Sequence, residues 1–211
     1  KTGKLTKIAE SAWGFGVSGH SHDHTKLLLG TGYSAGDGVL YSWVKGKQIL
    51  LYGKPLEDRK PGEQVPLNGL GYAVFSPSGK GAIVTSAVFE DTFSLGYIDL
   101  KKHGVIHPVK LKGAVHQGVG ELDNIVHLKD DRYLVTFNID GCSWAYEGIF
   151  DEAKLLMNLK YVLVGSEPFK GGMLEHMHYD QVEDVFTFSF STATSPTQIY
   201  TIEGDRRTDL A

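Results

Sequence analysis

Three histidines lie close together near the start of the chain, in the segment His20-Ser21-His22-Asp23-His24. In an extended strand, residues i, i+2 and i+4 lie on the same face, so the three imidazoles would share a face. Imidazole nitrogens are common zinc ligands, and the spacing therefore suggests a metal site formed by His20, His22 and His24. A metal-dependent hydrolase built on these histidines is one functional hypothesis.

The same segment can also be explained as a turn between two strands. Ser21-His22-Asp23-His24-Thr25-Lys26 leads into an apolar run, and Ser76-Pro77-Ser78-Gly79-Lys80 leads into another in the same way. A zinc site would also need distant ligands, for which the candidates are His116, His176 and His178. The turn is the favoured interpretation, and we expect no cofactor.

Nucleophilic catalysis has little support in the sequence. A serine hydrolase of the α/β type carries Gly-x-Ser-x-Gly between a strand and a helix. The nearest match is Gly16-Val17-Ser18-Gly19-His20, in which His20 replaces the last glycine and no helical pattern follows. The only cysteine, Cys142, lies beside strand-like residues and is interpreted as a packed thiol. We assign no catalytic residue and expect that this chain alone is not an enzyme.

The elements that position these residues recur along the chain. Four segments share one order of parts, namely a polar turn, an apolar run, a second turn and a strand that contains Tyr or Trp. The apolar runs begin at Leu27, Ala82, Tyr133 and Val185, so the spacings are 55, 51 and 52 residues. The aromatic strands are expected at 39–43, 95–99, 143–146 and 198–202. A further short strand is expected after the first three, at 48–52, 105–111 and 161–164.

Four strands repeated at this period are typical of a β-propeller. We predict an all-β fold, a single propeller domain over residues 1–211 with four recognisable four-stranded blades of about 52 residues. The expected blades are about 11–55, 70–112, 118–166 and 172–211, with 1–10 as an outer strand. Only 151–160 could form a helix, and it may equally be a turn into a strand, which disfavours strand–helix alternation. A two-sheet sandwich explains the recurrence less well.

Closure of the ring is left open by the sequence. The N-terminal strand could complete the last blade, or the blades could be completed by oligomerisation. An unclosed propeller exposes an apolar blade face, which favours self-association.

The innermost strands of a propeller surround a central channel. Glu175 and His176 lie on the expected innermost strand of the fourth blade, and Glu121 lies on that of the third. We predict that Glu121, Glu175 and His176 bind a ligand at the channel mouth. A hydrated polar channel wall explains the same residues without a ligand and is the favoured alternative.

Composition limits the classes of partner. The chain has 211 residues, a net charge of −4 and 41% hydrophobic residues, so we expect a packed core and neither a nucleic-acid nor a membrane partner. A single cysteine excludes a disulfide framework, and together with the absence of a signal-like segment it leads us to expect a cytoplasmic protein. The remaining Asp, Glu and Lys residues are interpreted as solvated turn residues.

Two motifs resemble those of a known family. The turn Ser76-Pro77-Ser78-Gly79-Lys80 is similar to the Ser-Pro-Asp-Gly-Lys turn of propeller repeats in the prolyl oligopeptidase superfamily. The tail resembles the last propeller blade of acylaminoacyl-peptidase-like serine hydrolases, where a strand, a Ser-Pro pair and a second strand precede the hydrolase domain. That tail reads Phe188-Ser189-Phe190-Ser191-Thr192-Ala193-Thr194-Ser195-Pro196-Thr197-Gln198-Ile199-Tyr200.

This resemblance implies a non-catalytic propeller that gates substrates or acts as a scaffold. In the family the propeller has about seven blades and lies over an α/β-hydrolase domain. The resemblance therefore implies an α/β-hydrolase domain as partner in the parent protein, although only four repeats are recognisable here. The alternative is a free-standing ligand- or protein-binding propeller.

Overall fold

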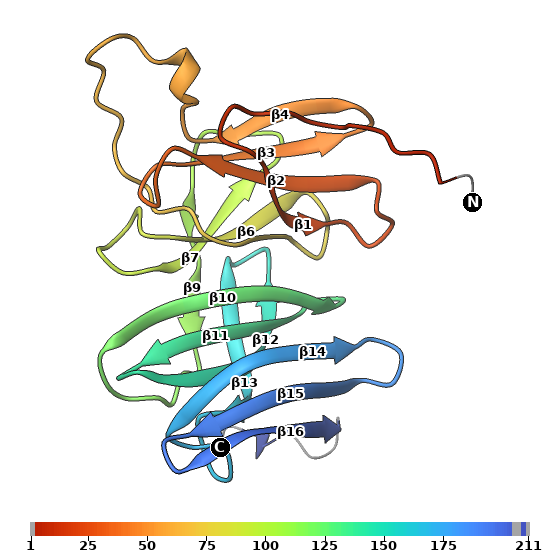
Figure 1. Cartoon of the computed structure of the whole chain (residues 1–211), viewed down its shortest axis with the longest axis vertical. Helices are drawn as coiled ribbons and strands as arrows, with labels where there is room; N and C mark the ends of the chain where they lie inside the picture. Colours follow the sequence, from red (N-terminus) through yellow and green to blue (C-terminus); the bar gives the residue numbers. More distant parts are fainter. Residues whose placement is uncertain (1–2, 204–207, 210–211) are drawn as a thin grey trace.

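The computed structural model describes residues 3–203 and 208–209, and these form the all-β fold predicted from the repeats (Figure 1). The strands form four sheets, which follow one another along the chain. The one helical element among the described residues is the short 3-10 helix η1 (Leu56–Asp58). No helix in this part of the chain is long and apolar enough to cross a membrane.

We name the four sheets A to D in chain order. Sheet A contains β1 (Gly16–His20), β2 (Lys26–Gly32), β3 (Gly38–Val44) and β4 (Lys47–Tyr52). Sheet B contains β5 (Ala73–Phe75), β6 (Gly81–Ser86), β7 (Ser94–Asp99) and β8 (His107–Pro108). Sheet C contains β10 (Gly120–Lys129), β11 (Arg132–Ile139), β12 (Cys142–Asp151) and β13 (Leu156–Val164), joined by β9 (Lys110–Lys112) and β17 (Thr208–Asp209). Sheet D contains β14 (Gly172–Asp180), β15 (Val185–Thr192) and β16 (Ser195–Glu203).

Two expected elements differ from the structure. Residues 3–10 contain no strand, and Leu5 is 96% exposed, because these residues have no sheet to pack against. The strand expected at 105–111 is divided in two, since Pro108 has no N–H for the ladder and the chain then crosses to pair with β13 of sheet C. The segment 151–160, left open as a helix or a turn into a strand, is a turn that leads into β13.

Sheet D also differs from the four-stranded pattern, because it has three strands among the described residues. The final short strand, β17, pairs with β13 of sheet C and adds nothing to sheet D. Sheet C therefore takes a strand from the segment before it, β9, and one from the segment after sheet D.

Apolar side chains are packed between neighbouring sheets in three clusters. Sheets A and B share a cluster that includes Leu28, Leu40 and Ile98. The largest cluster lies between sheets B and C and contains Ile83, Val135 and Tyr146. Phenylalanines of β15 pack on sheet C in the third cluster, where the members include Leu134, Leu163, Phe186, Phe188 and Phe190. Every residue of β6 is buried, as expected for a strand of a sheet covered on both faces.

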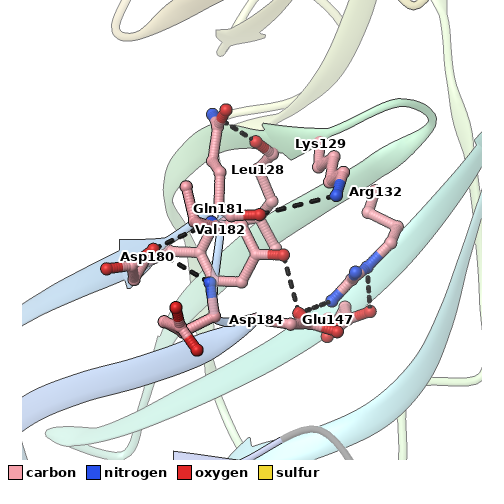
Figure 2. A network of polar contacts seen from close by, with 10 residues as sticks. Leu128, Lys129, Arg132, Glu147, Asp180, Gln181, Val182 and Asp184 are labelled. Carbon is pink, nitrogen blue, oxygen red and sulfur yellow. Dashed lines mark hydrogen bonds and ion pairs between the residues drawn. The ribbon is translucent and has the colours of Figure 1, made fainter.

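Arg132 pairs with two carboxylates, one of them buried, in contrast to the solvated turn residues expected for Asp and Glu. Glu147 of β12 is only 2% exposed and accepts a hydrogen bond from Arg132 Nε at 2.6 Å. The same guanidinium donates to Asp184 at 2.7 Å, at the start of sheet D (Figure 2). The Arg132 ion pairs therefore connect sheet C to sheet D.

The sheets are stacked in chain order, with sheets A and D at opposite ends of the molecule (Figure 1). Contacts between strands link sheet A to B, B to C and C to D. The described sheets thus form an open stack.

The two end faces of this stack differ in what covers them. At the sheet A end, residues 11–15 cover the outer face, where the Phe15 and Tyr41 rings meet edge to face at 5.7 Å. At the sheet D end, Thr187 and Ser189 alternate with the buried phenylalanines of β15 and so face outward. The free face of sheet D is therefore largely polar.

Candidate functional site

A cavity of about 460 Å³ lies between sheets B and C and is the candidate binding site. Its lining comes from the segments just before β5 and β7, from β6, and from the start of β10 with its neighbour β11. The lining residues are Gly71, Tyr72, Thr85, Phe93, Val119, Gly120, Glu121, Leu122, Asp123 and Asn138. Cavities of this size, with apolar walls and a few polar groups, are typical of small-ligand sites.

Two carboxylates lie on the β10 wall of the cavity. Glu121 and Asp123 flank Leu122, which is 2% exposed and packs in the core between sheets B and C. Glu121 Oε2 accepts a hydrogen bond from the backbone N of Phe93 at 2.9 Å. Asp123 Oδ2 accepts one from Thr136 Oγ1 at 3.2 Å. These bonds fix both carboxylates against the two sheets.

The remaining walls suit a positively charged group. Tyr72 and Phe93 supply aromatic rings, whose faces attract cations. No Lys, Arg or His is among the described residues that line the cavity, and neither carboxylate takes part in an ion pair there. The cavity therefore combines negative charge and aromatic surface without a cation of its own.

Of the three residues predicted to bind a ligand, only Glu121 lines this cavity. Glu175 lies on sheet D, where its Oε1 accepts hydrogen bonds from Ser191 Oγ at 3.1 Å and Thr197 Oγ1 at 2.8 Å. His176 is exposed on β14. The sequence placed all three on inner strands, but it contained no signal for Tyr72 or Phe93, which join the site from another sheet.

The histidine segment adopts the turn that the repeat comparison suggested. Ser21 N donates to Lys26 O and His24 N donates to Ser21 O, and Ser76 N to Gly81 O and Gly79 N to Ser76 O repeat both bonds in sheet B. Each serine Oγ also accepts a hydrogen bond from the backbone N five residues later. The two turns are thus the same structure.

The three histidines do not form a metal-binding set in this turn. The rings of His20 and His24 stack with centroids 4.6 Å apart, and His20 and His22 both line a cavity of about 220 Å³. Asp23 is engaged by Ser21 and Thr25, whose hydrogen bonds lower the pKa of its carboxyl to about 2. Within residues 3–203 and 208–209, no group of three or more His, Cys, Asp or Glu is arranged to hold a metal ion.

A second cavity, of about 610 Å³, lies where turns of all four sheets meet. His22 comes from sheet A, Pro77 from sheet B, Lys129 from sheet C and Gln181 from sheet D. Gln181 Nε2 donates to Leu128 O at 2.6 Å, which fixes the turn of sheet D against sheet C (Figure 2). Three of the four sheets contribute a polar side chain, namely His22, Lys129 and Gln181, so the lining of this cavity is mixed in polarity.

The other candidate residues, His116, Cys142 and Ser18, lie in strands or in packing contacts. His116 Nδ1 lies 2.8 Å from the Tyr146 hydroxyl, its ring packs near Phe137 and Trp144, and burial lowers the pKa of the imidazole. Cys142 is half-buried at the start of β12. Ser18 lies inside strand β1, where a nucleophile elbow would need a strand-to-helix turn.

No protein-family model and no curated protein sequence matches this chain. Solved structures do match its fold. TolB from Acinetobacter baumannii superposes with a TM-score of 0.60 at 12% identity, over 96% of this chain and 44% of that one. A puromycin-hydrolyzing peptidase from Mycobacterium tuberculosis gives 0.61 at 10% identity, over 99% and 30%. Oligopeptidase B from Trypanosoma brucei gives 0.60 at 13% identity, over 93% and 27%.

The chain spans less than half the length of each of these three proteins. The identities are low, so the likeness concerns the fold. The four described sheets match the β-propeller regions of TolB and of the oligopeptidases, and this chain forms a propeller-like β domain.

Proposed function

We propose that this chain is a non-catalytic propeller domain that gates substrates or acts as a scaffold beside the α/β-hydrolase domain of a larger serine peptidase. The observation that carries the proposal is the structure of the elbow-like motif. Gly16–His20 forms strand β1, and the described residues contain no α-helix that could follow it. The fold shared with oligopeptidase B and the puromycin-hydrolyzing peptidase supports it.

Hydrolysis assays with the purified chain test this proposal. We expect no turnover of p-nitrophenyl esters or acyl-peptide p-nitroanilides above the rate of a heat-denatured sample, because the elbow-like motif around Ser18 lies in a strand and presents no activated nucleophile. Turnover that a serine-directed fluorophosphonate abolishes would refute the non-catalytic assignment. A carboxylate-dependent turnover that the inhibitor leaves intact would refute it too, in favour of a hydrolase of another class.

A second candidate function is ligand binding by the cavity between sheets B and C. Glu121 and Asp123 place two negative charges beside the rings of Tyr72 and Phe93. An alkylammonium group, such as a lysine side chain or the amino end of a peptide, would bring the missing cation and an apolar stem. This candidate needs no hydrolase partner and applies equally to a free-standing binding propeller.

Titration with n-butylammonium, followed by calorimetry, tests the cavity. Glu121→Gln keeps an oxygen for Phe93 N and removes one charge, so we expect at least a tenfold loss of affinity, or about 1.4 kcal/mol. Glu175→Gln is the matched control, because Glu175 carries the same charge on sheet D and lies outside the cavity lining. Equal losses in both variants, or binding of n-butanol as tight as that of the cation, would contradict a site specific for cations.

A further inference from the structure

The outer edges of the four sheets are protected to different degrees. An unpaired strand edge offers a row of free N–H and C=O groups to another strand, so proteins usually shorten, cover or charge it. The edge of sheet B is the two-residue strand β8, which contains Pro108. Strand β13 of sheet C is covered by β9 and β17. The edge strand of sheet A, β4, carries the charged Lys47. A loop also covers part of this edge, where Gly104 N donates a hydrogen bond to Leu51 O.

Strand β16 of sheet D has none of these features over most of its length. Among the described strands, only β15 pairs with it. Its register irregularity and Pro196 both lie near the hairpin at its start, so residues 197–203 present a regular edge. Glu203, its last residue, is its one charged side chain. Ile199 projects from the middle of the strand and is 77% exposed.

The residues around Ile199 are nearly symmetric in type. The order is Thr197, Gln198, Ile199, Tyr200 and Thr201. In an antiparallel pair of two copies centred on Ile199, each Ile199 faces the other and each Thr197 faces the partner's Thr201. Gln198 then faces the partner's Tyr200, and these two side chains already form a hydrogen bond within one copy. Apolar, hydroxyl and amide–aromatic pairs of this kind stabilise neighbouring strands.

We propose that the free edge of β16 is an interaction surface for a second copy of this chain. The two β16 strands pair antiparallel about a twofold axis at Ile199, and sheet D of one copy continues into sheet D of the other. The pairing satisfies the edge N–H and C=O groups and removes both Ile199 side chains from water. Twofold pairing through one self-complementary patch is the usual form of a homodimer. The inference is independent of the proposed function, since β16 lies on another sheet from the cavity.

Light scattering behind size exclusion, over loading concentrations up to about 1 mM, measures the association. We expect the mass to rise from 23.1 kDa towards twice that value as the concentration increases. Ile199→Lys sets two like charges face to face and should weaken the dimer at least tenfold. Val182→Lys is the control, because Val182 is also a β-branched apolar residue, 87% exposed, but lies in the turn between β14 and β15, away from the β16 edge.

Cross-linking tests the geometry in the same samples. In a Cys142→Ser background, Ile199→Cys should form a disulfide-linked dimer on mild oxidation, whereas Val182→Cys should remain monomeric. Circular dichroism and thermal melts confirm that each variant is folded. A chain that stays monomeric up to the highest concentration would overturn the proposal, and so would a dimer that Ile199→Lys leaves intact. A cross-linked product from Val182→Cys in equal yield would also overturn it.

Discussion

At the scale of single residues, Glu152 links two sheets through a dense group of hydrogen bonds. It belongs to the turn between β12 and β13, and its carboxylate accepts bonds from Ser76 Oγ at 2.7 Å and Ser78 Oγ at 2.8 Å. The Tyr97 hydroxyl donates to the same carboxylate at 2.8 Å. Burial acts to raise the pKa of Glu152, but these bonds outweigh it, and the pKa lies below its ordinary value. The ionised form is therefore the one that joins sheets B and C.

Replacing this carboxylate should lower the stability of the folded chain by an amount that depends on pH. We expect Glu152→Gln to lower the free energy of unfolding at pH 7 by about 1–2 kcal/mol, a range that allows for partial exposure. Because the pKa is depressed in the folded chain, the stabilisation is present above the ordinary value of about 4.3 and is lost as the pH falls through the folded value. Urea unfolding between pH 3 and 7 measures the difference from wild type, which should shrink with acidity.

The exposed Glu90 provides a control for the loss of one negative charge. Glu90→Gln should leave the unfolding free energy within about 0.5 kcal/mol of wild type at every pH. A constant difference between Glu152→Gln and wild type from pH 7 to pH 3 would show that the charge on Glu152 does not carry the contact.

At the scale of elements, one turn residue carries a backbone strain that its equivalent avoids. His24 has a φ of 54°, and Gly79 has a φ of 63° at the same position of the matching turn. A left-handed conformation costs a residue with a Cβ about 1–2 kcal/mol, and glycine does not incur this cost. Asp130 and Asp184 also have positive φ in the corresponding turns of sheets C and D. A positive φ thus recurs in the first turn of all four sheets, and the matching position is defined by the equal turns of sheets A and B.

Substitution by glycine at this position should stabilise the fold. We expect His24→Gly to raise the free energy of unfolding by about 0.5 kcal/mol, since relief of strain exceeds the extra freedom of glycine in the unfolded chain. His22→Gly, two residues earlier where φ is not positive, should lower it. Thermal melts of the two variants measure these changes in stability. A loss of stability in both variants would refute the strain argument.

The turns and central strands could be predicted from the sequence, because their signals are local. Ser21 and Ser76 each begin a polar turn before an apolar run, and the structure repeats the same hydrogen bonds in both. The paths of β9 and β17 could not be predicted, because a short polar strand such as Lys110–Lys112 carries no information on which sheet it will join. Their partner, β13, is set by the packing of the sheets.

At the scale of the whole molecule, the number of sheets followed from the spacing of the repeats, whereas the arrangement of the ends did not. Residues 11–15 pack on the outer face of sheet A, and hydroxyl side chains of β15 face outward from sheet D. Similarly, the carboxylates of Glu121 and Asp123 could be placed on an inner strand, but the aromatic wall opposite them is formed by residues about 30–50 positions away in sequence. Cavities between sheets depend on such distant neighbours.

The pairing of strand β13 has a further consequence for the order in which the molecule unfolds. It is held by β12 on one side, and on the other by β9 and β17, which come from before sheet C and after sheet D. Sheet C can therefore separate only after segments on both sides of it have been released, whereas β1 at the open end has only β2 as a ladder partner. The amide hydrogens of sheet C should accordingly exchange with solvent only in the most complete opening events, and those of β1 by local fraying. We therefore expect sheet C to be the part of the chain that opens last.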